Sequence, residues 1–357
     1  MKILSINPGS TSTKIAVYED LNPVFVQNLK HSTEELSPFN KIIDQYDFRK
    51  KVILEFLEKN GVDVHSFDAV VGRGGLLKPI PGGVYRVNQT MIDDLKKGLQ
   101  GEHASNLGGL IAYEIAKAAG CEDNAFIVDP VVVDELDELA RFSGHPLLPR
   151  RSIFHALNQK AVARRFAREH SKNYNELTLI VVHLGGGISV GLHKNGKVIE
   201  VNNALDGDGP FSPERSGSLP VGDLVSLCYS GKYELQEVKK MITGKGGFVA
   251  YLDTNDAYEV EIRALEKNDE EARKVFFAMA YQVAREIGSL APVVSGKVDA
   301  ILITGGMARS KPLTEYLTEH VKFIAPVHLY PGEDEMQALS EGVYYGIKGE
   351  IEIKEYK

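Results

Sequence analysis

Two glycine-rich turns, each set between strand-like runs, hold the residues of this chain that are best suited to bind phosphate groups. The first lies in ILSINPGSTSTKIAVYE (residues 3–19) and the second in TLIVVHLGGGISVGLHKNGKV (residues 178–198), almost half the chain apart. Hydroxyls, backbone N–H groups and a lysine in the first turn could each donate to phosphoryl oxygens. The side chains concerned are Ser10, Thr11, Ser12 and Lys14. Gly and Ser also occur in ordinary tight turns, but the repetition at half-length favours two turns that bind one phosphate chain.

The segment after each turn has the pattern of a strand. Residues 13–18 alternate polar and apolar side chains and are rich in β-branched residues, which predicts that each turn joins the strands of a hairpin. A Walker loop and a dinucleotide fingerprint both need a helix to begin where the turn ends. These two common nucleotide motifs are therefore excluded, and GSTSTK also lacks the glycine before its lysine.

Two arginines lie where a guanidinium group could bind an anion. Arg73 follows the apolar run 69–71 and precedes two glycines, so its planar fork could reach a carboxylate or a phosphate. Arg215 lies in ERSG, within an irregular stretch rich in glycine and proline (residues 203–220), and loops of that length usually have a function. The alternatives are a solvated arginine at a strand end and a charge on a surface loop.

Three histidines and one aspartate lie at transitions between secondary-structure elements, where functional side chains of α/β proteins gather. The histidines are His103, His155 and His183, and Asp129 ends the apolar run 125–128. The histidines do not have metal-ligand spacing, and a single histidine of this kind is more often a structural residue than a catalyst. Asp129 could orient a cation or cap the segment that follows.

Near the C-terminus, ILITGGMARSKPL (residues 301–313) predicts a buried strand that ends in Gly305-Gly306 and leads into a helix. Paired glycines let a flat ring or a sugar approach the backbone closely. A plain strand-to-helix turn would use the same residues.

The composition is that of an ordinary globular protein, with 25% charged and 43% apolar residues. A net charge of −8 argues against a basic stripe for nucleic acid, so the expected partner is a small molecule. Cys121 and Cys228 are too few for a disulfide framework and lack a metal-binding spacing. Neither a leader pattern nor an apolar run of about 18 residues occurs, which predicts a cytoplasmic protein without a membrane segment.

Strand-like and helix-like runs alternate along the chain, which predicts an α/β protein with mixed sheets. The length of 357 residues suits two domains, with a boundary near Pro149-Arg150-Arg151. Strands are expected at residues 68–71, 125–128, 179–184 and 300–304, and amphipathic helices at 106–119, 155–170, 269–290 and 334–346.

In their order along the chain, these motifs resemble the family of acetate and butyrate kinases. The motifs are NPGSTSTK, GEHASNLGG, FIVDP, FHALN, HLGGG, ERSG and ITGGMA, and they extend from one end of the chain to the other. Within the family, NPGSTSTK and EHASNLGG are most similar to the butyrate kinases and the branched-chain fatty acid kinases. The superfamily also holds sugar kinases, heat-shock chaperones and actin.

The resemblance implies an α/β fold of two domains with duplicated βββαβα cores of the ribonuclease H-like, actin-like ATPase type. The first domain would comprise residues 1–150 and a C-terminal helix at about 338–357, and the second residues 151–337 with the nucleotide and dimer surfaces. ATP would bind in the cleft between the domains, with the two hairpins facing its phosphates. A homodimer or a larger homo-oligomer is expected.

The resemblance also implies roles for individual residues. Arg73 and Arg215 would contact the carboxylate and the transferred phosphoryl group, and His155 would stabilise that group during transfer. Asn7, Asp129 and Glu335, with Asp334 as an alternative to Glu335, would hold and orient Mg²⁺. Acetate kinases place an asparagine where this chain has Gly186, so one side-chain contact is lost there. The residues expected to contact ATP are Ser10, Ser12, Lys14, His183, Gly185, Gly186, Gly187, Asp256 at the ribose, and Gly305 and Gly306 at the adenine.

The expected reaction is reversible, in-line transfer of the γ-phosphoryl group of ATP to butyrate or a branched short-chain fatty acid, which gives an acyl phosphate and ADP. A carboxylate is already ionised at neutral pH, so it needs alignment and charge neutralisation rather than a general base. Gly74 and Gly75 stand where acetate kinases carry branched apolar side chains, which predicts a roomier acid pocket. The rivals are a sugar kinase, which would need a carboxylate base, and a non-catalytic ATP-binding module, which would lack both arginines.

Overall fold

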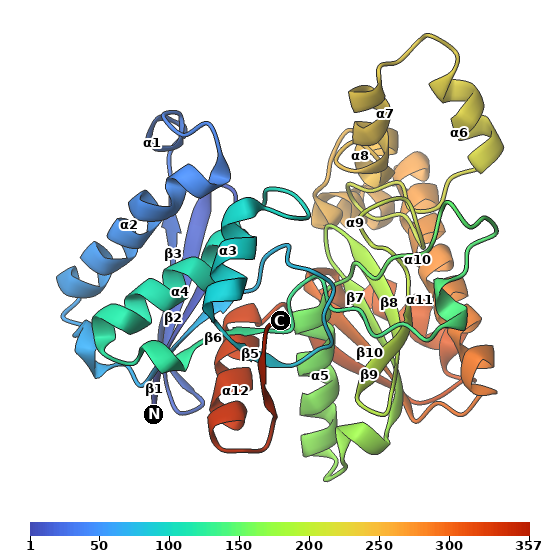
Figure 1. Cartoon of the computed structure of the whole chain (residues 1–357). Helices are drawn as coiled ribbons and strands as arrows, with labels where there is room; N and C mark the ends of the chain where they lie inside the picture. The colour runs from blue at the N-terminus through green and yellow to red at the C-terminus, as the bar shows by residue number, and fades with distance from the viewer. The chain divides into compact units, whose positions relative to one another are not determined.

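The computed structural model describes all residues from 1 to 357 and contains two compact units, each organised around one β-sheet (Figure 1). The first unit comprises Met1–Val133 and Asp334–Lys357, and the second comprises Asp134–Glu333. The domain boundary expected near residue 150 stays a prediction. In the structure, Arg150 pairs with the Glu200 carboxylate and donates to the backbone oxygen of Val201, both within the second unit.

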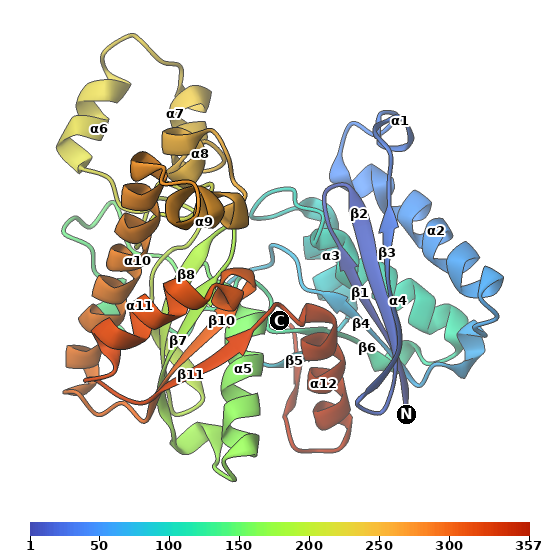
Figure 2. The same ribbon diagram turned by 180° about the vertical axis from the view of Figure 1, so that it is seen from behind.

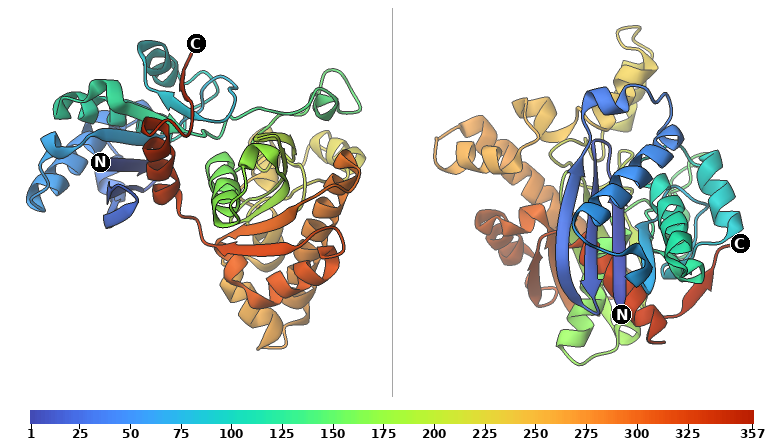
Figure 3. Two further views of the ribbon diagram at one scale, coloured as in Figure 1. Left: turned by 90° about the horizontal axis from the view of Figure 1, so that it is seen from below. Right: turned by 90° about the vertical axis from the view of Figure 1, so that its left-hand side faces the viewer.

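The sheet of the first unit has seven strands in the order β12-β5-β6-β4-β1-β2-β3. Its first three strands form an antiparallel meander, and β4 lies parallel to β1 on the other side, with Ile6 opposite Gly72. Both ends of the chain belong to this sheet (Figure 3). The strands are β1 (Lys2–Pro8), β2 (Ser12–Glu19), β3 (Asn22–Lys30), β4 (Ala69–Arg73), β5 (Val84–Arg86), β6 (Ala125–Val128) and β12 (Ile353–Glu355).

Helices cover both faces of this sheet because its central strands are apolar on both sides. Ile15 and Val17 of β2 belong to the core formed with α2, α3 and α4, whereas Ala16 and Tyr18 face the other way and pack against Met336 of α12. This alternation follows from the period of two in a strand. The helices of the unit are α1 (Thr33–Leu36), α2 (Tyr46–Lys59), α3 (Gln89–Lys97), α4 (Asn106–Ala119) and α12 (Glu335–Ile347).

The second unit repeats the same strand order with five strands, β11-β10-β7-β8-β9. In each unit the first strand lies between its antiparallel hairpin partner and a parallel strand that follows later in the chain. The predicted duplicated core is therefore confirmed. The strands are β7 (Thr178–Leu184), β8 (Ile188–Lys194), β9 (Lys197–Val201), β10 (Ala300–Gly305) and β11 (Val327–Pro331).

Here too helices cover both faces of the sheet (Figure 2), and the strand side chains on both faces are buried. Helix α5 (Ala156–Glu169) packs through Val162 and Phe166 on the face that carries Leu179 and Val181, and the long helix α10 (Glu270–Leu290) packs on the face that carries Ile180 and Val182. The remaining helices are α6 (Val221–Cys228), α7 (Leu235–Ile242), α8 (Gly247–Leu252), α9 (Ala257–Leu265) and α11 (Lys311–Val321).

The strands and amphipathic helices expected from the sequence are all present. Helix α4 has the predicted bounds, α10 begins after its N-cap Asp269, whose carboxylate accepts from Ala272 N, and residues 203–220 contain neither helix nor strand. No helix combines the length and the hydropathy needed to span a bilayer.

Candidate functional site

The first glycine-rich turn joins β1 to β2 and leaves its polar side chains available to a ligand. Asn7 pairs with Lys14 across the hairpin, and Gly9 N donates to Ser12 O at 2.8 Å, which closes the turn. Ser10 and Lys14 are exposed, the hydroxyls of Ser10 and Ser12 have no hydrogen-bond partner within the chain, and Lys14 has no ion pair. This hairpin can therefore donate to an anion without first giving up an internal contact.

A buried arginine that the sequence analysis did not identify holds this turn by hydrogen bonds to its backbone. Arg49 of α2 is fully buried, and its guanidinium donates to Ser10 O and Ser12 O at 3.0 Å each and to Thr13 Oγ1 at 3.1 Å. Burial lowers the pKa of Arg49 to about 10. The sequence could have indicated its burial, because Arg49 precedes the buried Ile53 and Leu57 at four-residue intervals and so lies on the apolar face of the helix.

The polar candidate residues Asn7, Arg73, Asp129 and Glu335 of the first unit lie at the ends of three neighbouring strands and at one helix N-terminus. Asn7 ends β1, Arg73 ends β4 and Asp129 follows β6. Glu335, in the first turn of α12, accepts from Asn7 Nδ2 at 2.6 Å and pairs with Arg73 Nη1 at 2.7 Å. Asp129 is buried with φ +36°, and its Oδ1 accepts from Gly83 N at 2.7 Å.

Some oxygens at these strand ends are of the kind that Mg²⁺ binds together with phosphate groups. The chain holds no group of three or more His, Cys, Asp or Glu residues placed to enclose a metal. Mg²⁺ is commonly bound by only one or two carboxylates together with substrate phosphates and water. The carboxylates of Glu335 and Asp129 and the Asn7 amide oxygen provide ligands of the type that this ion prefers.

The two glycines after Arg73 have a packing role instead of opening a pocket. A Cβ built on Gly74 would lie 2.5 Å from Pro130 Cβ, and one on Gly75 would lie 2.5 Å from the Asn106 Cα. The space beside both glycines is already filled by the chain. The expectation that they make the acid pocket roomier is therefore wrong, because each permits a close approach of two segments.

In the second unit, His155 and His183 stack face to face beside the second turn. Their ring centroids are 3.8 Å apart with an interplanar angle of 11°. His155 precedes α5 and its Nδ1 lies 2.9 Å from Ser189 Oγ, while His183 on β7 lies 2.8 Å from Asn158 Oδ1 through Nδ1. His183 Nε2 is 3.2 Å from the Glu333 carboxylate, an ion pair when the ring is protonated.

Arg215 lies against the second glycine turn, and its charge is compensated only in part. Its Nη1 donates to Ala204 O at 2.6 Å, and its buried Nε has no hydrogen-bond partner. Burial lowers the pKa of Arg215, and the neighbouring Glu214 offsets that effect only in part. A side chain on Gly187 would overlap the guanidinium, so this glycine makes room for it. A buried donor without an acceptor is costly, and a bound anion would satisfy it.

The remaining candidate residues of the second unit lie in less charged surroundings. Gly305 has φ +94° and no space for a Cβ beside the Leu184 backbone, whereas Gly306 is exposed and open. Asp256 caps α9, since its Oδ1 accepts from the N–H groups of Tyr258 and Glu259 at 2.9 and 3.2 Å.

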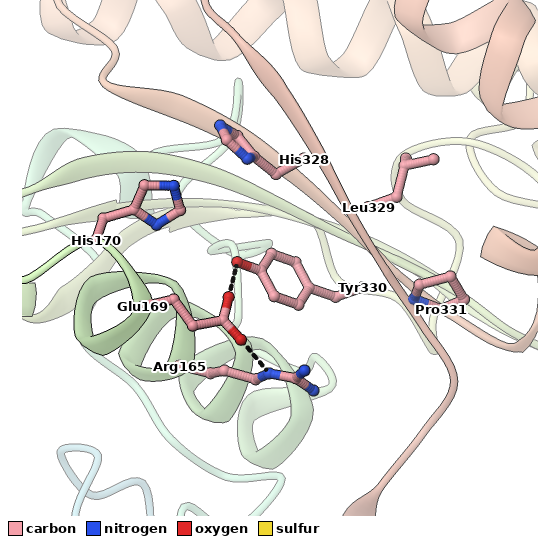
Figure 4. A pocket seen from close by; sticks show the side chains of 7 residues that line it. All are labelled: Arg165, Glu169, His170, His328, Leu329, Tyr330 and Pro331. Carbon is pink, nitrogen blue, oxygen red and sulfur yellow. Dashed lines mark hydrogen bonds and ion pairs between the residues drawn. The ribbon is translucent and has the colours of Figure 1, made fainter.

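A separate pocket of about 380 Å³ lies between the end of α5 and β11 (Figure 4). Glu169 accepts from Arg165 Nε at 2.8 Å and from the Tyr330 hydroxyl at 2.7 Å, as the dashed lines show. The charged groups there neutralise one another, and none of the residues expected from the sequence lines it. The structure therefore assigns this pocket no part in the candidate site.

Comparison with known proteins gives a consistent family. A family model described as the acetokinase family matches residues 143–326. Butyrate kinase 2 and butyrate kinase 1 of Clostridium acetobutylicum are similar to this chain, at 59% and 58% identity, and each alignment covers 100% of this chain and 99% of the relative. The crystal structure of Porphyromonas gingivalis acetate kinase has the same fold, with a TM-score of 0.78 at 18% identity over 96% of this chain and 98% of its own.

Proposed function

This chain belongs to the acetokinase family, and we propose that it transfers the γ-phosphoryl group of ATP reversibly to butyrate or a branched short-chain fatty acid. The products are an acyl phosphate and ADP. The observation that carries the proposal is the identity of 59% to a butyrate kinase over the whole chain. The preference for butyrate rests on this relationship, since the glycines after Arg73 do not enlarge a pocket.

The acid needs no general base, because its carboxylate is ionised at neutral pH. The obstacle is the approach of one anion to another, and positioned cations and N–H donors reduce it. Direct in-line transfer, without a covalent enzyme intermediate, is the mechanism that such a set of groups supports. Rapid-quench labelling that traps a phosphohistidine or a phosphoaspartate would contradict it.

We assign the residues of the second unit to the anions of the reaction. Arg215, with its unsatisfied Nε, contacts the transferred phosphoryl group or the carboxylate. His155 donates to an equatorial phosphoryl oxygen, and the backbone of Gly185, Gly186 and Gly187, with His183, contacts the ATP phosphates. Asp256 and Gly305-Gly306 are proposed to contact the ribose and the adenine.

Residues of the first unit are assigned to the phosphates and their metal. Ser10, Ser12 and Lys14 donate to phosphoryl oxygens, and Arg73 contacts the carboxylate while Glu335 holds its orientation at 2.7 Å. Asn7, Asp129 and Glu335 would hold Mg²⁺. When bound, that ion would neutralise charge on the phosphates.

Location in the cytoplasm, assembly as a homodimer or a larger homo-oligomer, and the absence of nucleic-acid and membrane partners are further predictions for this chain. Light scattering would measure the oligomeric state directly.

The test is the rate of acyl hydroxamate formation from ATP, hydroxylamine and straight or branched acids of two to five carbons. We expect kcat/KM to be highest for butyrate or isobutyrate, because each extra buried CH₂ contributes about 0.8 kcal/mol where it fits. An optimum at acetate would contradict the substrate preference. ATP binding without hydroxamate from any acid would contradict the carboxylate kinase activity itself and favour a non-catalytic module.

A further inference from the structure

A chain of hydrogen bonds runs through the interior of the second unit and ends on His155. It joins the Tyr174 hydroxyl to His193 Nδ1 at 2.8 Å, His193 Nε2 to Gln159 Oε1 at 3.0 Å, and Gln159 Nε2 to Ser189 Oγ at 2.8 Å. Ser189 Oγ lies 2.9 Å from His155 Nδ1. The central residues Gln159, Ser189 and His193 are fully buried.

The geometry of two elements explains why these residues meet. His155 and Gln159 are four residues apart at the start of α5, so they share one helix face. Ser189 and His193 lie on one face of β8, with Gly191 between them. A Cβ on Gly191 would lie 2.5 Å from Gln159 Oε1, so this glycine admits the Gln159 carboxamide between the two side chains.

The direction of each bond follows from the one group in the network that can only accept. Gln159 also contacts the Ser189 backbone oxygen at 3.1 Å, and a carbonyl oxygen requires a donor, so the Gln159 atom there is its nitrogen. The carboxamide oxygen then faces His193, whose Nε2 must donate. Burial lowers the pKa of His193 well below its usual value, with Lys160 and Arg164 adding to the effect, so this ring is neutral and accepts from Tyr174.

Because the Ser189 hydroxyl accepts from Gln159, it is expected to donate its own proton to His155. It accepts from Gln159 Nε2 and lies 3.4 Å from the His155 backbone N–H, and His155 Nδ1 is the one atom in reach that can accept its proton. If Nδ1 carried a proton instead, the buried Ser189 hydroxyl would be surrounded by donors and its own hydrogen would have no acceptor. A buried donor without an acceptor is unfavourable, so this tautomer is disfavoured.

We propose that Ser189 and Gln159 are positioning residues that hold the ring proton of neutral His155 on Nε2. The ring then presents an N–H donor to the transferred phosphoryl group, where the other tautomer would present a lone pair to an anionic oxygen. This role in catalysis rests on the proposed function, whereas the position of the proton does not. The stack with His183 at 3.8 Å fixes the plane of the ring.

The test reads the proton directly by ¹⁵N NMR of the full chain labelled at histidine, at a pH where His155 is neutral. The His155 signal is assigned by its loss in His155→Asn. We expect the proton on Nε2 in the wild type, a mixture of both tautomers in Ser189→Ala, and a fall in kcat of about tenfold in that variant with an unchanged KM for ATP. Gln159→Glu is isosteric, and its carboxylate would accept a hydrogen bond from the Ser189 hydroxyl. The Ser189 oxygen would then accept from His155, so the ring proton of His155 should move to Nδ1 and kcat should fall about 10²-fold.

Ser5→Ala is the matched control, since Ser5 is buried on β1 with a hydroxyl that has no partner. It should leave the His155 signal and kcat unchanged. A wild-type proton on Nδ1, or wild-type tautomer and kcat in Ser189→Ala, would overturn the proposal; if Ser189→Ala does not fold, Gln159→Glu and the wild-type spectrum decide. If no acid supports turnover but the proton lies on Nε2 and responds to Ser189→Ala, the proposed function fails and the positioning role in proton placement stands.

Discussion

The two units share one strand order, but their two candidate arginines differ in what compensates the charge. In the first unit, Arg73 pairs with Glu335, which also accepts from Asn7. In the second, Arg215 is held at the glycine turn with a buried Nε that has no acceptor. The charge of Arg73 is therefore compensated by a carboxylate before any ligand binds. The neighbouring Glu214 offsets the burial of Arg215 only in part, so a bound anion would stabilise this cation further.

The largest effect is expected when either candidate arginine is replaced, and the two variants should differ in stability although both lose activity. Arg215→Gln and Arg73→Gln should each lower kcat/KM about 10² to 10³-fold. Without ligand, Arg215→Gln should unfold at the wild-type temperature or above, because it removes a desolvated charge, whereas Arg73→Gln leaves the Glu335 carboxylate without its cation and should be less stable by about 1 kcal/mol or less. The unfolding temperatures of both variants measure these stabilities. A larger loss of stability in Arg215→Gln than in Arg73→Gln would contradict the difference proposed between the two arginines.

A second change tests the magnesium site proposed for the first unit. Glu335→Gln keeps the hydrogen bond from Asn7 but loses the charge, so the Mg²⁺ concentration that gives half the maximal rate should rise about 10- to 100-fold. Titration of activity with Mg²⁺ measures it. Glu350→Gln, an exposed carboxylate beyond α12, is the control. An unchanged Mg²⁺ dependence in Glu335→Gln would remove this residue from the metal site.

A smaller effect is expected at the second turn. Gly187→Ala places a methyl group on the Arg215 guanidinium, which must move, so kcat should fall about tenfold. Gly288→Ala in α10 has open space around its Cβ and should stabilise the protein by about 0.5 to 1 kcal/mol without changing kcat. Equal kinetics in the two variants would show that Arg215 does not need its position beside the turn.

The smallest effect is on stability as the pH falls, and both units should contribute. Burial lowers the pKa of His193 and, together with Arg49, that of His31. The unfolded chain then binds protons that the folded chain does not, so stability is complete above pH 6.5 and decreases as the pH falls through the window below that value. Thermal unfolding between pH 8 and pH 5 should show this decrease, and His31→Gln should reduce it by about 1 kcal/mol or less. A variant with the wild-type pH dependence would contradict the assignment to His31.

Much of the fold is predictable from the sequence, because the spacing of apolar residues and the residues that begin and end each element agree in the long elements. Helix α4 is mostly apolar, with Glu114 and Lys117 in its second half, and its C-cap is Gly120 with φ +79°. Helix α10 has acidic residues in its first turn and Pro292 beyond its end. The hairpins were predictable because alternating β-branched residues follow each turn.

The candidate site was less predictable because pairing depends on which strand ends meet. Sequence motifs indicate Arg73 and Glu335, but their contact across more than 260 positions is set by the docking of α12 on the sheet. Arg49 and Gln159, which have indirect roles, resemble ordinary polar residues of a helix. Only their spacing along the helix indicates that they lie on its buried face. The glycines after Arg73 were misread because a missing side chain can make room for a ligand or for another part of the chain.

Chemical rescue of Arg215→Ala tests most directly the claim that this partly compensated cation receives the anion of the reaction. ATP-dependent hydroxamate formation from butyrate would be measured with guanidinium chloride at millimolar concentrations, far below those of about 1 M and above that unfold proteins, with tetramethylammonium chloride as the control. We expect kcat to fall about 10²-fold in Arg215→Ala, and we expect guanidinium, but not tetramethylammonium, to restore part of it. Wild-type turnover in Arg215→Ala without any addition would contradict it.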